Sequence, residues 1–159
     1  MSGRKPAGGA DRSAYDRALG MLARREYSQR ELRARLERAG CDEAESESAL
    51  VKLRGEHYQD DQRFGEMLVR ARVEQGYGPN RIRAELRTHA LNDAAIRALL
   101  DATGVDWVER ATAQLRKKYA GKPATPAERA KRAAFLLRRG FAADTARIVT
   151  RSDGGDPGD

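Results

Sequence analysis

The side chains of this sequence that could carry out binding chemistry are mainly cationic. Residues 107–151 hold 12 basic and 3 acidic residues, a formal charge of +9 in a chain whose total is +7. By contrast, residues 1–55 carry +3 and residues 56–106 carry −2. A field this concentrated favours a polyanion or an acidic protein surface as partner. We therefore expect the last third of the chain to be used for binding.

Residues suited to catalysis or metal binding are few. The chain has two histidines, His57 and His89, and one cysteine, Cys41. These residues form no zinc-ligand cluster and leave little for a nucleophilic triad. The pair Gly8-Gly9 lies in a polar leader rather than between a strand and a helix, so it is not a phosphate-binding loop. We expect no enzyme activity, no metal and no cofactor, and we expect Cys41 to be a small buried residue.

Helices must position the charged residues, because the composition is rich in Ala, Leu, Arg and Glu, with few β-branched runs. Apolar residues recur at helical spacing, as in Tyr15, Ala18, Leu19 and Leu22. No apolar stretch approaches the roughly 18 residues of a membrane span. Because a signal peptide is also lacking and the single cysteine cannot close an internal disulfide, we expect a cytoplasmic protein.

An internal repeat of fifty residues organises the sequence. Leu36, Leu86 and Leu136 are separated by fifty residues each. Four positions after each leucine comes a small residue: Gly40, Ala90 and Gly140. The two glycines suit the left-handed conformation that often follows a helix end. Alanine adopts that conformation less readily, so we expect the middle corner to be shaped differently.

Each repeat reads as three short helices, which predicts an all-α fold: an elongated or curved array of three tandem three-helix repeats. The predicted parts are a flexible leader (1–12), the three repeats (13–55, 56–105 and 106–151) and an acidic flexible tail (152–159).

Helix ends and core positions follow from the same pattern. We expect Ser28, with Glu31 three residues later, to cap one second helix, and Pro79 and Pro126 to lie in the first turns of the others. Short polar residues near the starts of the third helices are expected to cap them: Asp42, Asn92 and Asp144. The predicted core includes Leu32, Leu36, Ile82, Leu86, Leu136, Leu137, Ile148 and Val149.

Four stretches resemble a known family. Residues 60–72 (DDQRFGEMLVRAR) and 76–86 (GYGPNRIRAEL) are similar to the middle-repeat signature of the RecX family. Residues 27–32 (YSQREL) and 135–141 (FLLRRGF) resemble its first and last motifs. The resemblance covers about residues 13–150 in order. Two departures are Ala90, where a glycine is usual, and Gly65, where an alanine is usual.

The resemblance implies a regulatory protein that binds the filament of the bacterial recombinase RecA on DNA. It implies inhibition of filament growth, ATPase, strand exchange and co-protease activity, and so modulation of recombination and the SOS response. We expect a monomer that binds DNA weakly or through the filament and does not bind membranes. The candidate contacts with RecA or DNA are Arg70, Arg72, Arg81, Arg83, Arg116, Lys117, Lys118, Lys131, Arg132, Arg138 and Arg139.

The alternative is a helical nucleic-acid-binding protein that acts on DNA or RNA without RecA. Three-helix units can present a recognition helix with outward polar side chains. Two such sets exist in the sequence: Arg30, Arg33 and Arg35, or Arg81, Arg83 and Arg87. Tight binding to bare nucleic acid with a steep salt dependence would favour this alternative.

Overall fold

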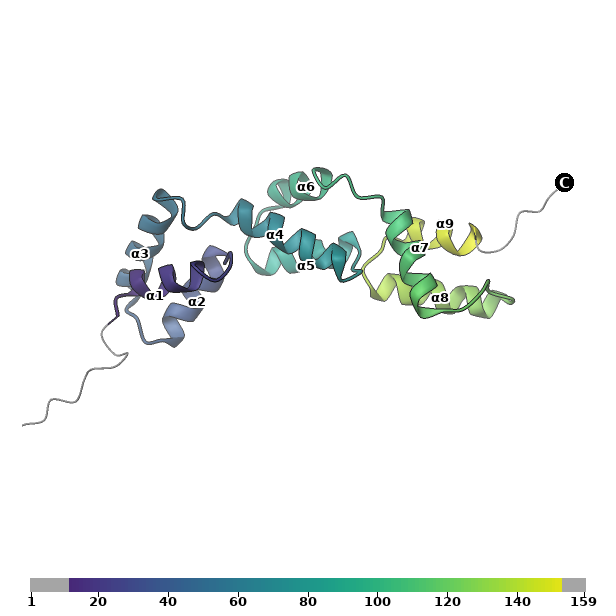
Figure 1. Ribbon diagram of the computed structural model, residues 1–159, viewed down its shortest axis with the longest axis horizontal. Coiled ribbons are helices and arrows are strands. Elements are labelled where there is room, and N and C mark those ends of the chain that lie inside the picture. The colour runs from purple at the N-terminus through teal and green to yellow at the C-terminus, as the bar shows by residue number, and fades with distance from the viewer. Residues whose placement is uncertain (1–11, 153–159) are drawn as a thin grey trace, which may run out of the picture. The chain divides into compact units, whose positions relative to one another are not determined.

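The computed structural model describes residues 12–152 (Figure 1). Within that range all regular structure is helical, and the helices are α1 (Ala14–Leu22), α2 (Gln29–Arg38), α3 (Glu43–Gly55), α4 (Asp61–Glu74), α5 (Pro79–Thr88), α6 (Asp93–Asp101), α7 (Trp107–Lys118), α8 (Pro126–Arg138) and α9 (Ala143–Ser152). The predicted all-α fold of three three-helix repeats is confirmed. Residues 1–11 and 153–159, which hold all but one residue each of the predicted leader (1–12) and tail (152–159), lie outside the described range. Ser152, predicted as the start of the tail, is the last residue of α9.

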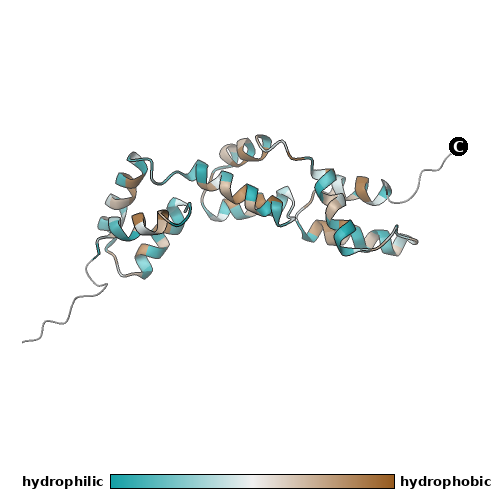
Figure 2. Ribbon diagram, viewed as in Figure 1, coloured by the Kyte–Doolittle hydropathy of each residue, from teal (hydrophilic) through white to brown (hydrophobic). Residues whose placement is uncertain are grey.

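The chain divides into two compact units, residues 1–64 and 65–159. In the first unit, α1, α2 and α3 share one hydrophobic core. Its buried residues are Ala14, Ala18, Tyr27, Leu32, Leu36, Ala49, Leu50 and Leu53. They recur at helical spacing, so each helix has an apolar face and a polar one, and Figure 2 shows apolar and polar segments alternating along the helices.

The second unit holds most of α4 and all of α5 to α9. Buried residues of its first three helices and of the turn between α5 and α6 include Leu68, Val69, Val73, Ile82, Leu86, Leu91, Ile96 and Leu99. A further cluster joins α7, α8 and α9: Ala111, Leu115, Phe135, Leu136, Phe141, Ala146 and Val149. We call α7–α9 the third repeat. No helix within residues 12–152 is long and apolar enough to cross a membrane.

A hydroxyl side chain caps the second helix in two of the three repeats, and a glycine stands there in the middle one. Ser28 caps α2, and its Oγ accepts a hydrogen bond from the Glu31 backbone N–H at 3.1 Å. Thr125 caps α8 in the same manner through the Glu128 N–H at 3.2 Å. Gly78 stands at the N-cap of α5 and has no side chain to contribute. As predicted, prolines occupy the first turns of α5 and α8: Pro79 and Pro126.

The third helices confirm one of the three expected caps. The Asn92 side chain accepts a hydrogen bond from the Ala95 N–H at 2.8 Å. Asp42 is the N-cap of α3 but makes no side-chain cap bond. Asp144 lies inside the first turn of α9 and pairs with Arg147, so it is not the cap residue.

The corners between the second and third helices share one backbone conformation. Gly40 and Gly140 have φ angles of 83° and 96°, as predicted. Ala90 has a φ angle of 62°, so the expectation of a differently shaped middle corner was wrong. The Leu91 N–H bonds to the Leu86 carbonyl at 3.4 Å, and this closure requires the left-handed residue between them. The corner therefore forms at Ala90 despite a steric cost of about 1–2 kcal/mol.

The prediction that Leu137 and Ile148 lie in the core was wrong. Leu137 is 49% exposed and Ile148 is 50% exposed. Each lies next to a buried neighbour, Leu136 or Val149, and consecutive helical residues point about 100° apart. Leu136 and Val149 face the core, and the turn of about 100° to the next or preceding position directs Leu137 and Ile148 to solvent. Cys41 is half-buried and packs against the core of the first unit.

Candidate functional site: the basic third repeat and its joint with α5

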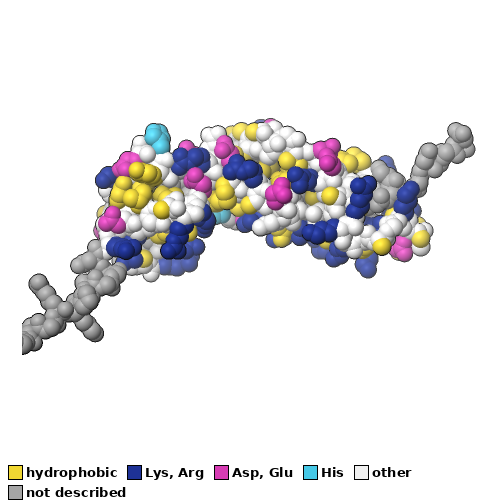
Figure 3. Space-filling view, viewed as in Figure 1, with side chains coloured by type: hydrophobic (Ala, Val, Ile, Leu, Met, Phe, Trp, Pro, Cys, Tyr) yellow, Lys and Arg dark blue, Asp and Glu magenta, His cyan; other side chains and the backbone are white. Residues whose placement is uncertain are grey.

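Seven of the eleven predicted contact residues have exposed side chains. They lie on α4, α5, α7 and α8: Arg70, Arg81, Arg116, Lys117, Lys118, Lys131 and Arg138. On the face drawn in Figure 3, Lys and Arg side chains are visible over α7 to α9. Helix α7 ends in three consecutive cations, Arg116, Lys117 and Lys118, which also interact favourably with the negative end of the helix dipole.

Arg132 is not part of this surface, which corrects its prediction as a contact. Its side chain is buried, with 7% of the residue exposed. The guanidinium donates to the carbonyl oxygens of Gly121 at 2.8 Å and Ala120 at 3.4 Å. It also lies 4.9 Å from the centre of the Tyr119 ring. Arg132 therefore holds the loop between α7 and α8 in place.

Arg72 is engaged in an ion pair within the second unit. Its Nε and Nη2 donate to the two carboxylate oxygens of Glu85 at 2.7 and 2.6 Å, and its Nη1 donates to Gln75 Oε1 at 3.1 Å. These hydrogen bonds lower the pKa of Glu85 and raise that of Arg72, although partial burial opposes both shifts. The pair joins α4 to α5, so the charge of Arg72 is already compensated. Arg83, also half-buried, bonds to Asn80 at 2.8 Å.

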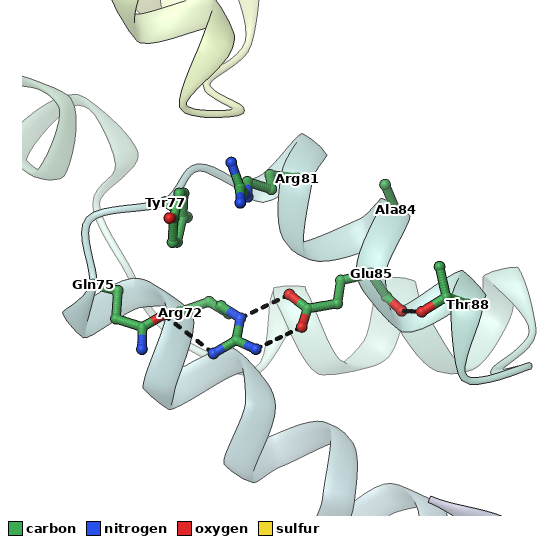
Figure 4. Close-up of a pocket in the computed structure, with 7 residues that line it drawn as sticks. All are labelled: Arg72, Gln75, Tyr77, Arg81, Ala84, Glu85 and Thr88. Atoms are coloured by element: carbon green, nitrogen blue, oxygen red, sulfur yellow. Dashed lines mark hydrogen bonds and ion pairs between the residues drawn. The ribbon is translucent and has the colours of Figure 1, made fainter. Parts of the chain in front are cut away.

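An open groove of about 560 Å³ lies beside this ion pair (Figure 4). Its lining residues come from the end of α4, the turn that follows and α5: Arg72, Gln75, Tyr77, Arg81, Ala84, Glu85 and Thr88. At one end of the groove the Arg81 guanidinium lies 3.9 Å from the centre of the Tyr77 ring. The lining is therefore a mixture of cationic, polar and aromatic groups.

The turn before α5 is also where the third repeat attaches. The Arg139 guanidinium lies 4.1 Å from the centre of the Tyr77 ring, and its Nη2 donates to the Gln75 carbonyl at 2.5 Å. The Gly78 N–H donates to the Arg139 carbonyl at 2.9 Å. The Asn80 N–H donates to the Gly140 carbonyl at 2.9 Å. We call this set of contacts the Tyr77 joint.

Two glycines allow the Tyr77 joint to close. A Cβ atom on Gly78 would overlap the Phe141 nitrogen and the Gly140 carbonyl group. A Cβ atom on Gly140 would overlap the backbone of Arg81. The backbones thus approach closely enough that no side chain fits at either position.

The first unit has a related cluster around Tyr27. The Arg25 guanidinium lies 3.5 Å from the centre of that ring. The buried Gln59 side chain donates to the Tyr27 carbonyl at 3.3 Å and to Asp61 Oδ1 at 2.9 Å, and Asp61 also accepts from the Gln29 N–H at 2.9 Å. Tyr27 and Tyr77 lie fifty residues apart, the offset of the sequence repeat, so the two clusters occupy equivalent positions of their repeats. Nothing in the sequence pointed to Gln59, Gln75 or Glu85.

Titratable groups are dispersed in the part of the chain that is described. Across residues 12–152, no three His, Cys, Asp or Glu residues form a group that could hold a metal ion. Fold and surface together define a helical-repeat protein whose third repeat carries exposed cations.

Comparison with known proteins identifies the family. Family models match the first RecX three-helix domain at residues 14–53, the second at 60–100 and the third at 105–150. The chain is 42% identical over 147 residues to the regulatory protein RecX of Stenotrophomonas maltophilia K279a, covering 92% of this chain and 90% of the relative. It is 40% identical over 144 residues to that of Xanthomonas campestris pv. campestris B100, covering 90% and 89%. The chain therefore belongs to the RecX family of regulatory proteins.

Solved structures agree on the fold. A crystal structure of regulatory protein RecX aligns with a TM-score of 0.74 at 24% identity, covering 87% of this chain and 70% of that one. RecX from Lactobacillus salivarius aligns with a TM-score of 0.75 at 20% identity, covering 89% and 94%.

Proposed function

We propose that this protein binds the RecA nucleoprotein filament in the cytoplasm, as a monomer and without a cofactor, and inhibits its growth. Inhibition would lower the ATPase, strand exchange and co-protease activity of RecA, and so modulate recombination and the SOS response. Membership of the RecX family of regulatory proteins supports this proposal. The observation that carries it is the third repeat, where a formal charge of +9 falls within residues 107–151.

The exposed cations suit a filament as partner. Four cations are exposed on α7 and α8: Arg116, Lys117, Lys131 and Arg138. From there they can reach phosphates of the DNA in the filament or carboxylates of RecA. Arg70 and Arg81 add exposed charge on α4 and α5. Isolated contacts of this kind are individually weak in water, so we expect the protein to meet DNA mainly through the filament.

The test is the single-strand-dependent ATPase of RecA, with this protein titrated in at fixed salt. Blocking the growing end of a filament affects many protomers, so we expect inhibition well below one molecule per RecA. Inhibition should weaken on going from roughly 0.05 M to roughly 0.5 M salt, because exposed charges are screened. Absence of inhibition, together with tight binding to the bare strand, would favour the nucleic-acid-binding alternative instead.

Two triple variants with equal loss of charge locate the contact. The first replaces Arg116, Lys117 and Arg138 of the third repeat with alanine. The control replaces Arg24, Arg30 and Arg38 of the first unit, which are likewise exposed. We expect the first variant to raise the half-inhibiting concentration by about tenfold or more, and the control to change it much less. A larger effect of the control would contradict the assignment to the third repeat.

A further inference from the structure

We propose that Arg139 is a positioning residue: its side chain locks the basic third repeat onto α5, and regulation of the filament requires that lock. This inference rests on the proposed function and specifies how the binding surface is held. Arg139 was predicted from the sequence as a contact with the partner. The structure gives its guanidinium a different role from that of its neighbour Arg138, which is exposed at the end of α8.

The Arg139 side chain contacts the turn before α5 at two groups. One amino group bonds to the Gln75 carbonyl at 2.5 Å, and the guanidinium lies 4.1 Å from the centre of the Tyr77 ring. Its Nε is buried and donates to no partner among residues 12–152. A guanidinium fixed in this way has little freedom to reach a separate molecule.

The backbone around Arg139 completes the lock. The first N–H groups of a helix lack partners within the helix, and those of α5 include Gly78 and Asn80. Their acceptors are the carbonyls of Arg139 and Gly140, each at 2.9 Å. The end of α8, with its partial negative charge, therefore caps the start of α5, with its partial positive charge.

Lysine cannot replace arginine in this lock. The guanidinium is planar, so it can lie against a ring and donate to a carbonyl at the same time. An ammonium group keeps the charge but lacks the planar face and the fork of donors. The charge-conserving Arg139→Lys change should therefore act like a deletion if Arg139 positions the repeat. If Arg139 instead contacted a phosphate as a point charge, lysine should largely preserve binding.

The first measurement is amide hydrogen exchange in the full chain, read by NMR at Gly78 and Asn80. These N–H groups cross the joint, so their exchange reports its opening without reference to activity. We expect Arg139→Lys to speed their exchange by about tenfold, the effect of losing a charge-assisted hydrogen bond and a ring contact. The control Arg97→Lys, at an exposed position of α6, should leave both rates unchanged. Exchange within α5, at Leu86, should stay slow in both variants.

The second measurement is inhibition of the RecA ATPase by the same variants. We expect Arg139→Lys to raise the half-inhibiting concentration by about tenfold, since repeat positioning is lost, while its salt dependence stays the same because no ionic contact is removed. Arg97→Lys, at an exposed position of α6 outside the proposed binding surface, should remain close to wild type. Equal inhibition by Arg97→Lys and Arg139→Lys, or unchanged exchange at Gly78 and Asn80, would overturn the inference.

A second variant guards against misfolding. Tyr77→Leu removes the aromatic ring that the Arg139 guanidinium contacts, without changing any charge. It should reproduce the faster exchange at Gly78 and Asn80 with an unchanged helical circular dichroism spectrum, and unchanged exchange would count against the lock. If the wild-type chain fails to inhibit RecA, the proposed function fails, but the exchange rates still decide whether the lock exists.

Discussion

The corners at Ala90 and Gly140 have the same backbone shape but different surroundings. Both residues have left-handed φ angles, 62° and 96°, and both are followed by a hydrogen bond back to the preceding helix. Ala90 is exposed, so its Cβ has room. Gly140 is buried against the backbone of Arg81, where a Cβ would overlap.

The difference shows what selects glycine at a helix corner. Left-handed backbone alone costs a side chain about 1–2 kcal/mol, which a folded repeat can absorb. Close approach of a second backbone leaves no volume for the side chain at all. A corner on which another helix packs, such as Gly140, therefore requires glycine, whereas an open corner holds glycine at Gly40 and alanine at Ala90.

The largest expected effect comes from Gly140→Ala. The added Cβ overlaps Arg81 and must also adopt the left-handed conformation, so we expect the free energy of unfolding to fall by about 2–4 kcal/mol. Urea denaturation measures this loss. The matched control is Gly40→Ala, where φ is 83° but no atom lies within 4 Å of the new Cβ, so only about 1 kcal/mol should be lost. Equal losses at the two sites would disprove the role of close approach.

Gly78→Ala isolates the steric part of the effect. Gly78 has an ordinary φ of −88°, so a Cβ there adds no backbone strain and only the overlap with Gly140 and Phe141 remains. We expect a loss of about 1–3 kcal/mol in unfolding free energy, again by urea denaturation. Gly55→Ala, where no neighbour lies within 4 Å, should cost less than about 0.5 kcal/mol. If Gly78→Ala left the free energy of unfolding unchanged, the Tyr77 joint would accommodate the added methyl group without cost.

Glu85→Gln tests the Arg72–Glu85 ion pair, which joins α4 to α5, the helix against which the Gly140 corner packs. The Arg72 hydrogen bonds lower the pKa of Glu85 in the folded chain, so the carboxylate stabilises the fold above its unfolded pKa of about 4.3. At pH 7 we expect the variant to lose about 0.5–1 kcal/mol, since the pair is partly open to solvent. The difference from wild type should shrink as the pH falls below about 4 through the folded-state pKa. Urea denaturation at pH 7 and below about pH 4 measures the two differences, and a difference that stays constant would contradict this origin.

Ala90→Gly should have the smallest effect and the opposite sign. Glycine relieves the left-handed strain, although it also makes the unfolded chain more flexible, so we expect a net gain of about 0.5 kcal/mol. A thermal melt of the two proteins side by side measures this gain. Destabilisation at this position would show that the Ala90 methyl group makes a contact worth more than the strain it carries.

Much of the fold could be predicted from local sequence rules. Helical spacing, the Ser28 cap and the prolines at helix starts depend on residues within a few positions of each other, so one sequence contains the information. The fifty-residue offset then revealed the repeats. Leu137 and Ile148 were misassigned because two adjacent apolar residues on a helix leave open which of them faces the core.

The site was less predictable because its contacts join distant parts of the chain. Arg139 and Gln75 are 64 residues apart, and Arg72 and Glu85 are 13 apart. No spacing rule relates such pairs, so the sequence did not reveal that three arginines predicted as partner contacts, Arg72, Arg132 and Arg139, bind groups within the protein. Only the sum of the charge in the third repeat could be obtained from composition alone.

The N-caps of α5 and α8 differ in what can lie against them. Gly78, the N-cap of α5, has no side chain, and the Gly140 corner lies directly against it. Thr125 holds the same position in α8, and its Oγ accepts a hydrogen bond from the Glu128 N–H. A glycine corner could not lie against α8 as Gly140 lies against α5, because the Thr125 side chain occupies the place that is empty at Gly78.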